Sequence, residues 1–146
     1  MIRFKLVDNT IELPKLQTPG SVGYDISAHS IAKVLDDGKI VVVNTGVACQ
    51  PPDGYFFQLH ERSSLHKLGW ALCNSVGVID TDYTGWVMAV LIQVRDNPTP
   101  VETLVNKRER ICQLVLHRAY TDFPVEYVDD LDVTHRGHGG FGSTSN

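Results

Sequence analysis

The stretch WVMAVLIQV, residues 86–94, indicates the fold most directly. It is apolar on both of its alternating faces, which is the pattern of a strand that is covered on both sides. The cover is either a second sheet or a neighbouring chain. The rest of the chain shows little helical periodicity, so this strand favours an all-β protein.

Shorter runs of β-branched and aromatic residues surround this stretch and alternate with Gly, Pro, Asn and Asp. Such spacing is typical of a sandwich or jelly roll. Turn signals stand at residues 36–38 (DDG) and 51–54 (PPDG). We expect further strands at residues 2–6, 39–43, 55–59, 111–117 and 125–128.

Two segments depart from the strand pattern. Residues 62–69 (RSSLHKLG) are expected to form one or two helical turns, with Ser63 or Ser64 as the N-cap and Gly69 as the terminator. Residues 136–146 (RGHGGFGSTSN) have the composition of a flexible tail. We therefore expect one β domain over residues 1–135, followed by a Gly- and Ser-rich tail.

Composition narrows the class of protein. A chain of 146 residues suits one domain, and a net charge of −4 argues against a broad nucleic-acid surface. No window approaches the length of an apolar membrane span. The single cysteines Cys49, Cys73 and Cys112 suggest buried thiols rather than a zinc site or disulfides. The expectation is a soluble protein of the cytoplasm, or of the host cell cytoplasm or nucleus if it is viral, with no membrane or nucleic-acid partner.

The segment GVIDTDYTG, residues 77–85, is the first candidate for chemistry. Asp80 follows a strand on a turn bounded by glycines, where its carboxylate can hold a water molecule while the Tyr83 ring covers a flat ligand. The structural alternative is a hairpin turn in which Asp80 bonds its own backbone.

Two segments are candidates for binding phosphate. In RSSLHK, Arg62 supplies a planar fork for phosphate oxygens, and Ser63 and Ser64 supply hydroxyl groups. A capped helical turn with solvated cations is the alternative. In the tail, glycines let backbone amides wrap a polyphosphate while Arg136 pairs with charge and Phe141 stacks on a base. Its alternative is a disordered terminus.

Asp25 and the segment NKRERICQL complete the candidates. Asp25 follows a Gly-rich approach and is suited to hold a hydrated magnesium ion through its waters. The second segment contributes Arg110 and Gln113, although Lys107, Arg108 and Arg110 also fit a solvated basic turn.

The order of these segments resembles a known family. PGSVGYDISA, ERSSLHK, GVIDTDYTG, KRERICQL and RGHGGFGSTS resemble the five motifs of the homotrimeric dUTP pyrophosphatase (dUTPase) family, in the expected order and across nearly the whole chain. The resemblance implies a jelly-roll or β-clip type distorted barrel with one short helix. It also implies a homotrimer with shared active sites, in which residues 136–146 act as a lid over a neighbouring site.

The resemblance also implies roles for single residues. Asp80 would orient and deprotonate the attacking water and touch the sugar 3′-hydroxyl, and Tyr83 would pack beneath deoxyribose. Asn74 and the hairpin from Gly77 to Met88 would read the uracil edge.

Further roles concern the phosphates and the metal. Asp25 would bind Mg²⁺ through water. The phosphate chain would be held by Arg62, Ser63, Ser64 and Gln113. From another subunit, Arg136, Ser143 and Thr144 would close on the γ-phosphate while Phe141 stacks over uracil. The implied reaction converts dUTP to dUMP and pyrophosphate, which limits uracil incorporation into DNA and supplies dUMP for dTMP synthesis.

Three residues depart from the family pattern. Glu61 stands where proline is usual and is expected to pair with Arg62 or to weaken phosphate affinity. Arg108 occupies a common glycine position and Ser145 replaces a usual final glycine, which makes both turns less certain.

Other functions fit the sequence less well. The related dCTP deaminase family needs a glutamate base about ten residues beyond Asp80, where this chain has Val90, and residues 86–94 contain no carboxylate. A nucleotide-sensing protein without catalysis is the second alternative, although Asp25 and Asp80 are both present. A structural coat subunit would leave residues 136–144 unexplained.

Overall fold

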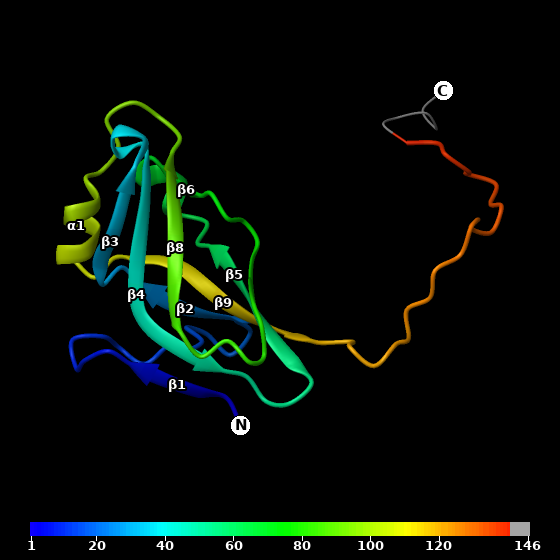
Figure 1. Ribbon diagram of the computed structural model, residues 1–146. Helices are drawn as coiled ribbons and strands as arrows, with labels where there is room; N and C mark the ends of the chain where they lie inside the picture. The colour runs from blue at the N-terminus through cyan, green and yellow to red at the C-terminus, as the bar shows by residue number, and fades with distance from the viewer. Residues whose placement is uncertain (141–146) are drawn as a thin grey trace.

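Strands with one strongly apolar face form two antiparallel sheets in the computed structural model, which describes residues 1–140 (Figure 1). The first sheet contains β1 (Arg3–Leu6), β3 (Ser30–Leu35), β4 (Ile40–Gln50), β6 (Trp70–Leu72) and β8 (Trp86–Gln93). The second contains β2 (Gly23–Ser27), β5 (Tyr55–Glu61), β7 (Gly77–Ile79) and β9 (Arg110–Arg118). Their orders are β1-β4-β8-β6, with β3 also paired to β4, and β2-β9-β5-β7.

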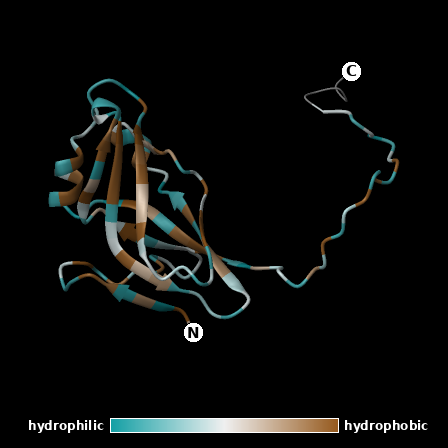
Figure 2. Ribbon diagram, viewed as in Figure 1, coloured by the Kyte–Doolittle hydropathy of each residue, from teal (hydrophilic) through white to brown (hydrophobic). Residues whose placement is uncertain are grey.

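Strand β8 has two apolar faces of different exposure. Val87, Ala89 and Leu91 are fully buried, whereas Met88 and Val90 on the opposite face are only half-buried. The upper parts of β4 and β8 are continuously hydrophobic rather than alternating (Figure 2). Within one chain, therefore, only one of the two apolar faces of β8 is fully covered.

The core lies between the sheets and contains Phe57 and Leu59 from β5, Leu114 from β9 and Val43 from β4, none of them exposed to solvent. Thr45 is also fully buried, and its hydroxyl donates to the Val87 carbonyl at 2.8 Å. This bond satisfies the only buried polar residue in the described core, at a site where the pairing of β4 with β8 is irregular.

The short helices differ in part from expectation. Residues 62–69 contain a 3₁₀ turn, η2 (Leu65–Leu68), which Gly69 ends at φ 87°. Ser64 occupies the N-cap position but makes no side-chain cap bond. The α-helix of the described chain is instead α1 (Val101–Asn106), which has only six residues and was not predicted, because so short a segment shows no periodicity. A further 3₁₀ turn, η1 (Asp36–Gly38), confirms the predicted turn there.

The chain leaves the sheets after β9 and continues as an extended segment (Figure 1). The strand predicted at residues 125–128 is wrong, since no neighbouring strand of the described chain pairs with it. Residues 119–140, called the arm below, expose large apolar side chains. These are Tyr120, Phe123, Val125, Tyr127, Val128, Leu131 and Val133.

The structure confirms the all-β class with one short α-helix. The strands expected at residues 2–6, 39–43, 55–59, 86–94 and 111–117 all form. Strands β2, β3 and β6 were missed, whereas β7 is the strand that Asp80 was expected to follow. Within residues 1–140, no helix has the length and apolarity needed to cross a membrane.

Candidate active site

Asp25 lies at the centre of a charged cluster. Its side chain is 8% exposed, and its two oxygens lie 3.1 Å from Arg62 Nε and 3.4 Å from Arg110 Nη1. Strand register explains the meeting, because Asp25 on β2 lies opposite Gln113 on β9, and Gln113 lies opposite His60 on β5. Arg62 follows the end of β5 and so reaches the same point.

Backbone contacts orient this cluster. The Arg62 N–H donates to the Ile111 carbonyl at 3.1 Å, and Gln113 Nε2 donates to the Glu61 carbonyl at 3.2 Å. Gly23 leaves room for the Gln113 side chain, since a Cβ at that glycine would overlap the amide of Gln113. Main-chain pairing therefore holds both phosphate candidates in place.

The cluster opens into a cavity of about 250 Å³. A guanidinium, a hydroxyl and an amide meet at its wall, a donor set that suits phosphate oxygens. The lining residues are Gln17, Ser21, Val22, Gly23, Asp25, Arg62, Ser63 and Gln113. Ser64 is not among them. We call this cavity the phosphate site.

A second group of candidates lies between β6 and β8, in residues 73–88, called the 73–88 segment below. The hairpin expected from Gly77 to Met88 does not form, because β7 pairs in the second sheet and β8 in the first. The Cys73 N–H donates to the Val90 carbonyl at 2.7 Å, and Asn74 Oδ1 accepts from the Val90 N–H at 3.3 Å. Gly77 packs directly against Asn74, because a Cβ at Gly77 would lie 3.2 Å from Asn74 Nδ2. Met88 lies on β8 opposite Asn44.

Tyr83 lies in the loop between β7 and β8. Its hydroxyl donates to the Trp86 carbonyl at 3.0 Å, and its N–H donates to the Asp80 carbonyl at 3.1 Å. The ring rests on Gly85, where a Cβ would lie 2.6 Å from the Tyr83 hydroxyl oxygen. The absence of a side chain at Gly85 therefore allows the Tyr83 ring to lie there.

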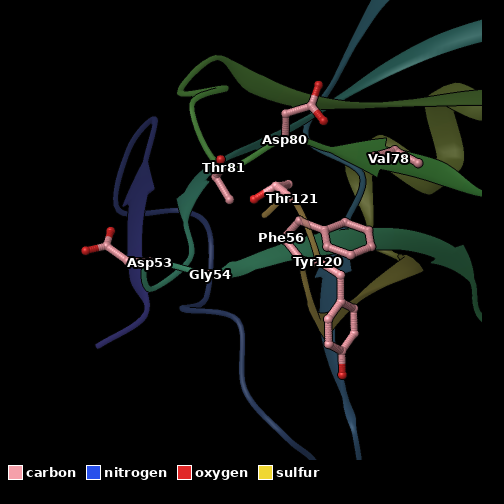
Figure 3. A pocket seen from close by; sticks show the side chains of 9 residues that line it. Asp53, Gly54, Phe56, Val78, Asp80, Thr81, Tyr120 and Thr121 are labelled. Carbon is pink, nitrogen blue, oxygen red and sulfur yellow. The ribbon is translucent and has the colours of Figure 1, made fainter. Parts of the chain in front are cut away.

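Asp80 follows β7 and is exposed. It borders a cavity of about 430 Å³ whose walls include Phe56, Tyr120 and Thr121. Its carboxylate points away from the two aromatic rings (Figure 3). The acid is thus presented to solvent rather than to the aromatic part of this cavity.

Within one chain, Asp80 does not lie near the phosphate site. Ile79 pairs with Phe57 near one end of β5, whereas Arg62 follows the opposite end. At about 3.3 Å per residue, the path from Phe57 to Arg62 along the strand is about 17 Å. The candidate base and the candidate phosphate ligands therefore form two separate groups.

Arg136, the tail candidate within the described residues, lies apart from both groups. Arg136 Nε donates to the Gly139 carbonyl at 2.8 Å within a local turn, at the far end of the arm (Figure 1). Phe141, Ser143 and Thr144 lie outside the described residues.

Two contacts of the site escaped prediction. Arg110 fitted a solvated basic turn but pairs with Asp25. Glu61 was expected beside Arg62, yet its carboxylate accepts the Leu72 N–H at 3.0 Å, while Arg62 pairs with Asp25. Both contacts join residues that are far apart in the sequence and meet only through the pairing of strands. No local sequence pattern could therefore have predicted them.

The chain as a whole matches a known family of proteins. The model of the dUTPase family matches residues 9–145. The chain therefore belongs to the dUTPase family of enzymes.

Curated relatives cover almost the whole chain. The deoxyuridine 5′-triphosphate nucleotidohydrolase of Caulobacter vibrioides (strain NA1000 / CB15N) is 37% identical, over 98% of this chain and 93% of its own. The enzyme of the same name from Escherichia phage T5 is 35% identical, over 99% and 98%.

Solved structures share the fold. A mutant of the Staphylococcus bacteriophage 80alpha dUTPase with dUpNHpp has a TM-score of 0.77 at 22% identity, covering 99% of this chain and 98% of that one. A mutant dUTPase from phage phi11 of S. aureus, described with a structural Mg(II) ion, has a TM-score of 0.68 at 18% identity, covering 91% and 99%.

Proposed function

We propose that this protein hydrolyses dUTP to dUMP and pyrophosphate, with water activated by Asp80 attacking the α-phosphorus. The observation that carries the proposal is the phosphate site, in which Arg62, Ser63 and Gln113 line one cavity of a dUTPase-family chain. Removal of dUTP would limit uracil incorporation into DNA and supply dUMP for dTMP synthesis.

The phosphate chain is proposed to bind at this site. The Arg62 guanidinium is already oriented by Asp25 at 3.1 Å and by its bond to the Arg110 carbonyl at 3.3 Å, so little side-chain entropy is lost when it meets a phosphate. Ser63 and Gln113 add neutral hydrogen bonds. Ser64 is proposed to contribute to the same phosphates from the start of η2.

The base and sugar are proposed to bind at the 73–88 segment. Asn74 and the backbone from Gly77 to Met88 would offer donors and acceptors at set positions, which rejects cytosine because its 4-amino group leaves buried partners mismatched. The Tyr83 ring, resting on Gly85, would fill the space that a 2′-hydroxyl needs.

The residues around Asp25 can bind Mg²⁺ only when the substrate phosphates supply further oxygen ligands. Within residues 1–140, no group of three or more His, Cys, Asp or Glu side chains could hold a metal ion alone. A single carboxylate beside a phosphate site does fit Mg²⁺, which keeps several waters and takes one or two carboxylates together with substrate phosphates. Asp25 would hold it through water. The ion would neutralise charge on the phosphate oxygens.

Two copies of the chain are needed to complete a site of this kind. Asp80 and Arg62 belong to separate groups in one chain, so the base of one copy would act on phosphates held by another. The half-buried face of β8 and the apolar arm supply surface for such contacts. We propose a homotrimer of β domains over residues 1–135.

The tail is proposed to act in the same assembly. Residues 136–146 would close as a lid over a neighbouring site, with Arg136, Ser143 and Thr144 on the γ-phosphate and Phe141 over uracil. Light scattering tests the trimer, and removal of residues 136–146 should lower turnover strongly while leaving the trimer folded.

The chemical step uses few groups of this chain. Asp80 would accept a proton from water as its oxygen attacks the α-phosphorus, and the bond from that phosphorus to the bridging oxygen would break. Arg62 would balance the charge on the leaving pyrophosphate. The three free cysteines fit a reducing compartment, and we propose a cytoplasmic location.

A pyrophosphate-release assay with Mg²⁺ tests the function. The substrates are dUTP, dCTP, dTTP and UTP, and the variants are Asp80→Asn and the control Asp82→Asn. We expect strong preference for dUTP and a loss of at least ~100-fold in kcat for Asp80→Asn alone. Equal turnover of dCTP, or an unimpaired Asp80→Asn enzyme, would overturn the proposal. Binding without turnover would favour a nucleotide-sensing role.

A further inference from the structure

A second polar cavity, of about 480 Å³, lies beside the phosphate site. We call it the basic cavity. Four of its lining residues are cationic and one is acidic. The lining consists of Thr10, Ile11, Glu12, Lys15, Gln17, Ser27, Lys107, Arg108 and Arg110. This local concentration of positive charge contrasts with the net charge of −4 of the whole chain.

Neutral oxygens, not acids, hold the Arg108 guanidinium in place. Its two terminal nitrogens donate to the His29 carbonyl and, at 2.8 Å, to Thr10 Oγ1. Throughout residues 1–140, neither Arg108 nor Lys107 has a carboxylate within 4.0 Å. Two positive charges therefore remain available at this wall. Glu12 is engaged with Lys15 at 3.6 Å.

The two cavities share part of their walls. Gln17 lines both of them, and Arg110 lines the basic cavity while its guanidinium lies 3.4 Å from Asp25 in the phosphate site. An anion leaving Arg62 would thus meet Arg110 and then Arg108. The path needs no opening of the sheets.

The lining also indicates the chemical class of the ligand. It contains no aromatic side chain on which a base could stack, and Ile11 is its one large apolar residue. Arginine and lysine favour phosphate oxygens, through planar forks and point charges respectively. An inorganic polyphosphate fits this lining better than a nucleotide.

We propose that the basic cavity binds inorganic pyrophosphate at a site separate from the phosphate site and receives it as it leaves. The identity of the ligand as a product rests on the proposed function, whereas the binding of a polyphosphate anion does not. Lys107 and Arg108 are its principal ligands, and Arg110 joins it to the phosphate site.

Calorimetric titration of pyrophosphate into the full chain, without nucleotide, tests the site. The variants are Lys107→Gln/Arg108→Gly, Arg62→Gln and the charge-matched control Lys33→Gln/Lys39→Gln. Glycine is chosen because Arg108 has φ 51°, a conformation that glycine adopts readily. We expect two pyrophosphates per chain in the wild type and the control. The Lys107→Gln/Arg108→Gly variant should weaken one site at least ~10-fold, and Arg62→Gln should weaken the other.

Two outcomes would overturn the inference. One is unchanged pyrophosphate binding in Lys107→Gln/Arg108→Gly. The other is a single wild-type site that Arg62→Gln abolishes. Inhibition of dUTP turnover by added pyrophosphate gives a second readout, and its inhibition constant should rise in the double variant while kcat stays unchanged. If dUTP is not hydrolysed at all, the proposed function fails, but the titration still decides the anion site.

Discussion

Glu61 Oε2 accepts a hydrogen bond from the Leu72 backbone N–H at 3.0 Å. This contact joins the end of β5, in the second sheet, to β6, in the first. Arg62 follows Glu61 directly, and Asn74 lies two residues beyond Leu72. One carboxylate therefore links the strand end that carries the proposed phosphate ligand to the 73–88 segment, which is proposed to read the base.

Loss of this link should affect substrate binding more than chemistry. In Glu61→Ala the Leu72 N–H loses its acceptor, which should cost about 1 kcal/mol in the free energy of unfolding, measured with urea. We expect KM for dUTP to rise about fivefold, equivalent to about 1 kcal/mol, with kcat little changed. Glu61→Gln keeps an acceptor oxygen and should restore most of the affinity. Equal KM values for both variants and the wild type would exclude a positioning role.

Gly85→Ala should weaken the discrimination between deoxyribose and ribose. The new Cβ would lie 2.6 Å from the Tyr83 hydroxyl oxygen, so the ring must move. We expect the ratio of kcat/KM for dUTP to that for UTP to fall at least ~10-fold, because the ring no longer fills the space of the 2′-hydroxyl. Gly20→Ala is the control, since nothing lies within 4 Å of a Cβ there. An unchanged ratio in Gly85→Ala would show that Tyr83 does not select the sugar.

One of the three thiols should react selectively in the native protein. Burial raises the pKa of Cys49 to about 11 and, together with the nearby Glu61, the pKa of Cys112 to about 12. Both thiols therefore stay protonated at neutral pH, and the thiolate is the reactive form. Cys73 is exposed beside Asn74. A chromogenic disulfide should modify one thiol per native chain.

The modification also reports on the base site. A non-hydrolysable dUTP analogue should slow the labelling of Cys73, because the ligand would cover the 73–88 segment, which includes this thiol. Cys73→Ser should remove the fast reaction altogether. Fast labelling that is unaffected by the analogue would place the base elsewhere.

Acid stability should depend on Asp8. Hydrogen bonds from the Thr10 hydroxyl and N–H, at 2.6 and 2.8 Å, lower its pKa from 3.8 to about 2, and His29 adds a smaller contribution. Because the folded-state pKa is depressed, the stabilisation is fully present above pH 3.8 and is lost as the pH falls towards about 2.

Asp8→Asn removes this pH-dependent part of stability. Unfolding by urea between about pH 5 and pH 2 should show a shallower decline for the variant than for the wild type. Asp130→Asn, in the arm, is the charge-matched control. Parallel declines of the wild type and Asp8→Asn would contradict the assignment.

Local sequence patterns determined the fold class. The runs of apolar and β-branched side chains along residues 86–94 and 111–117 depend only on neighbours in the chain, and both strands form. The same reasoning failed at residues 125–128, where the β-like composition has no partner strand in the described chain. It also missed β6, whose three residues are too few to show a period.

The sequence by itself determined the family and identified the candidate residues and their order, since five segments resemble the motifs of one family. Only the tertiary structure decided which of them meet. Strand register places Asp25 beside Arg62 and Arg110, joins Glu61 to Leu72, and leaves Phe57, which pairs with the last residue of β7, about 17 Å from Arg62 along β5. These relationships depend on pairing between segments far apart in the chain, and a shift of register by one residue would turn every side chain to the opposite face.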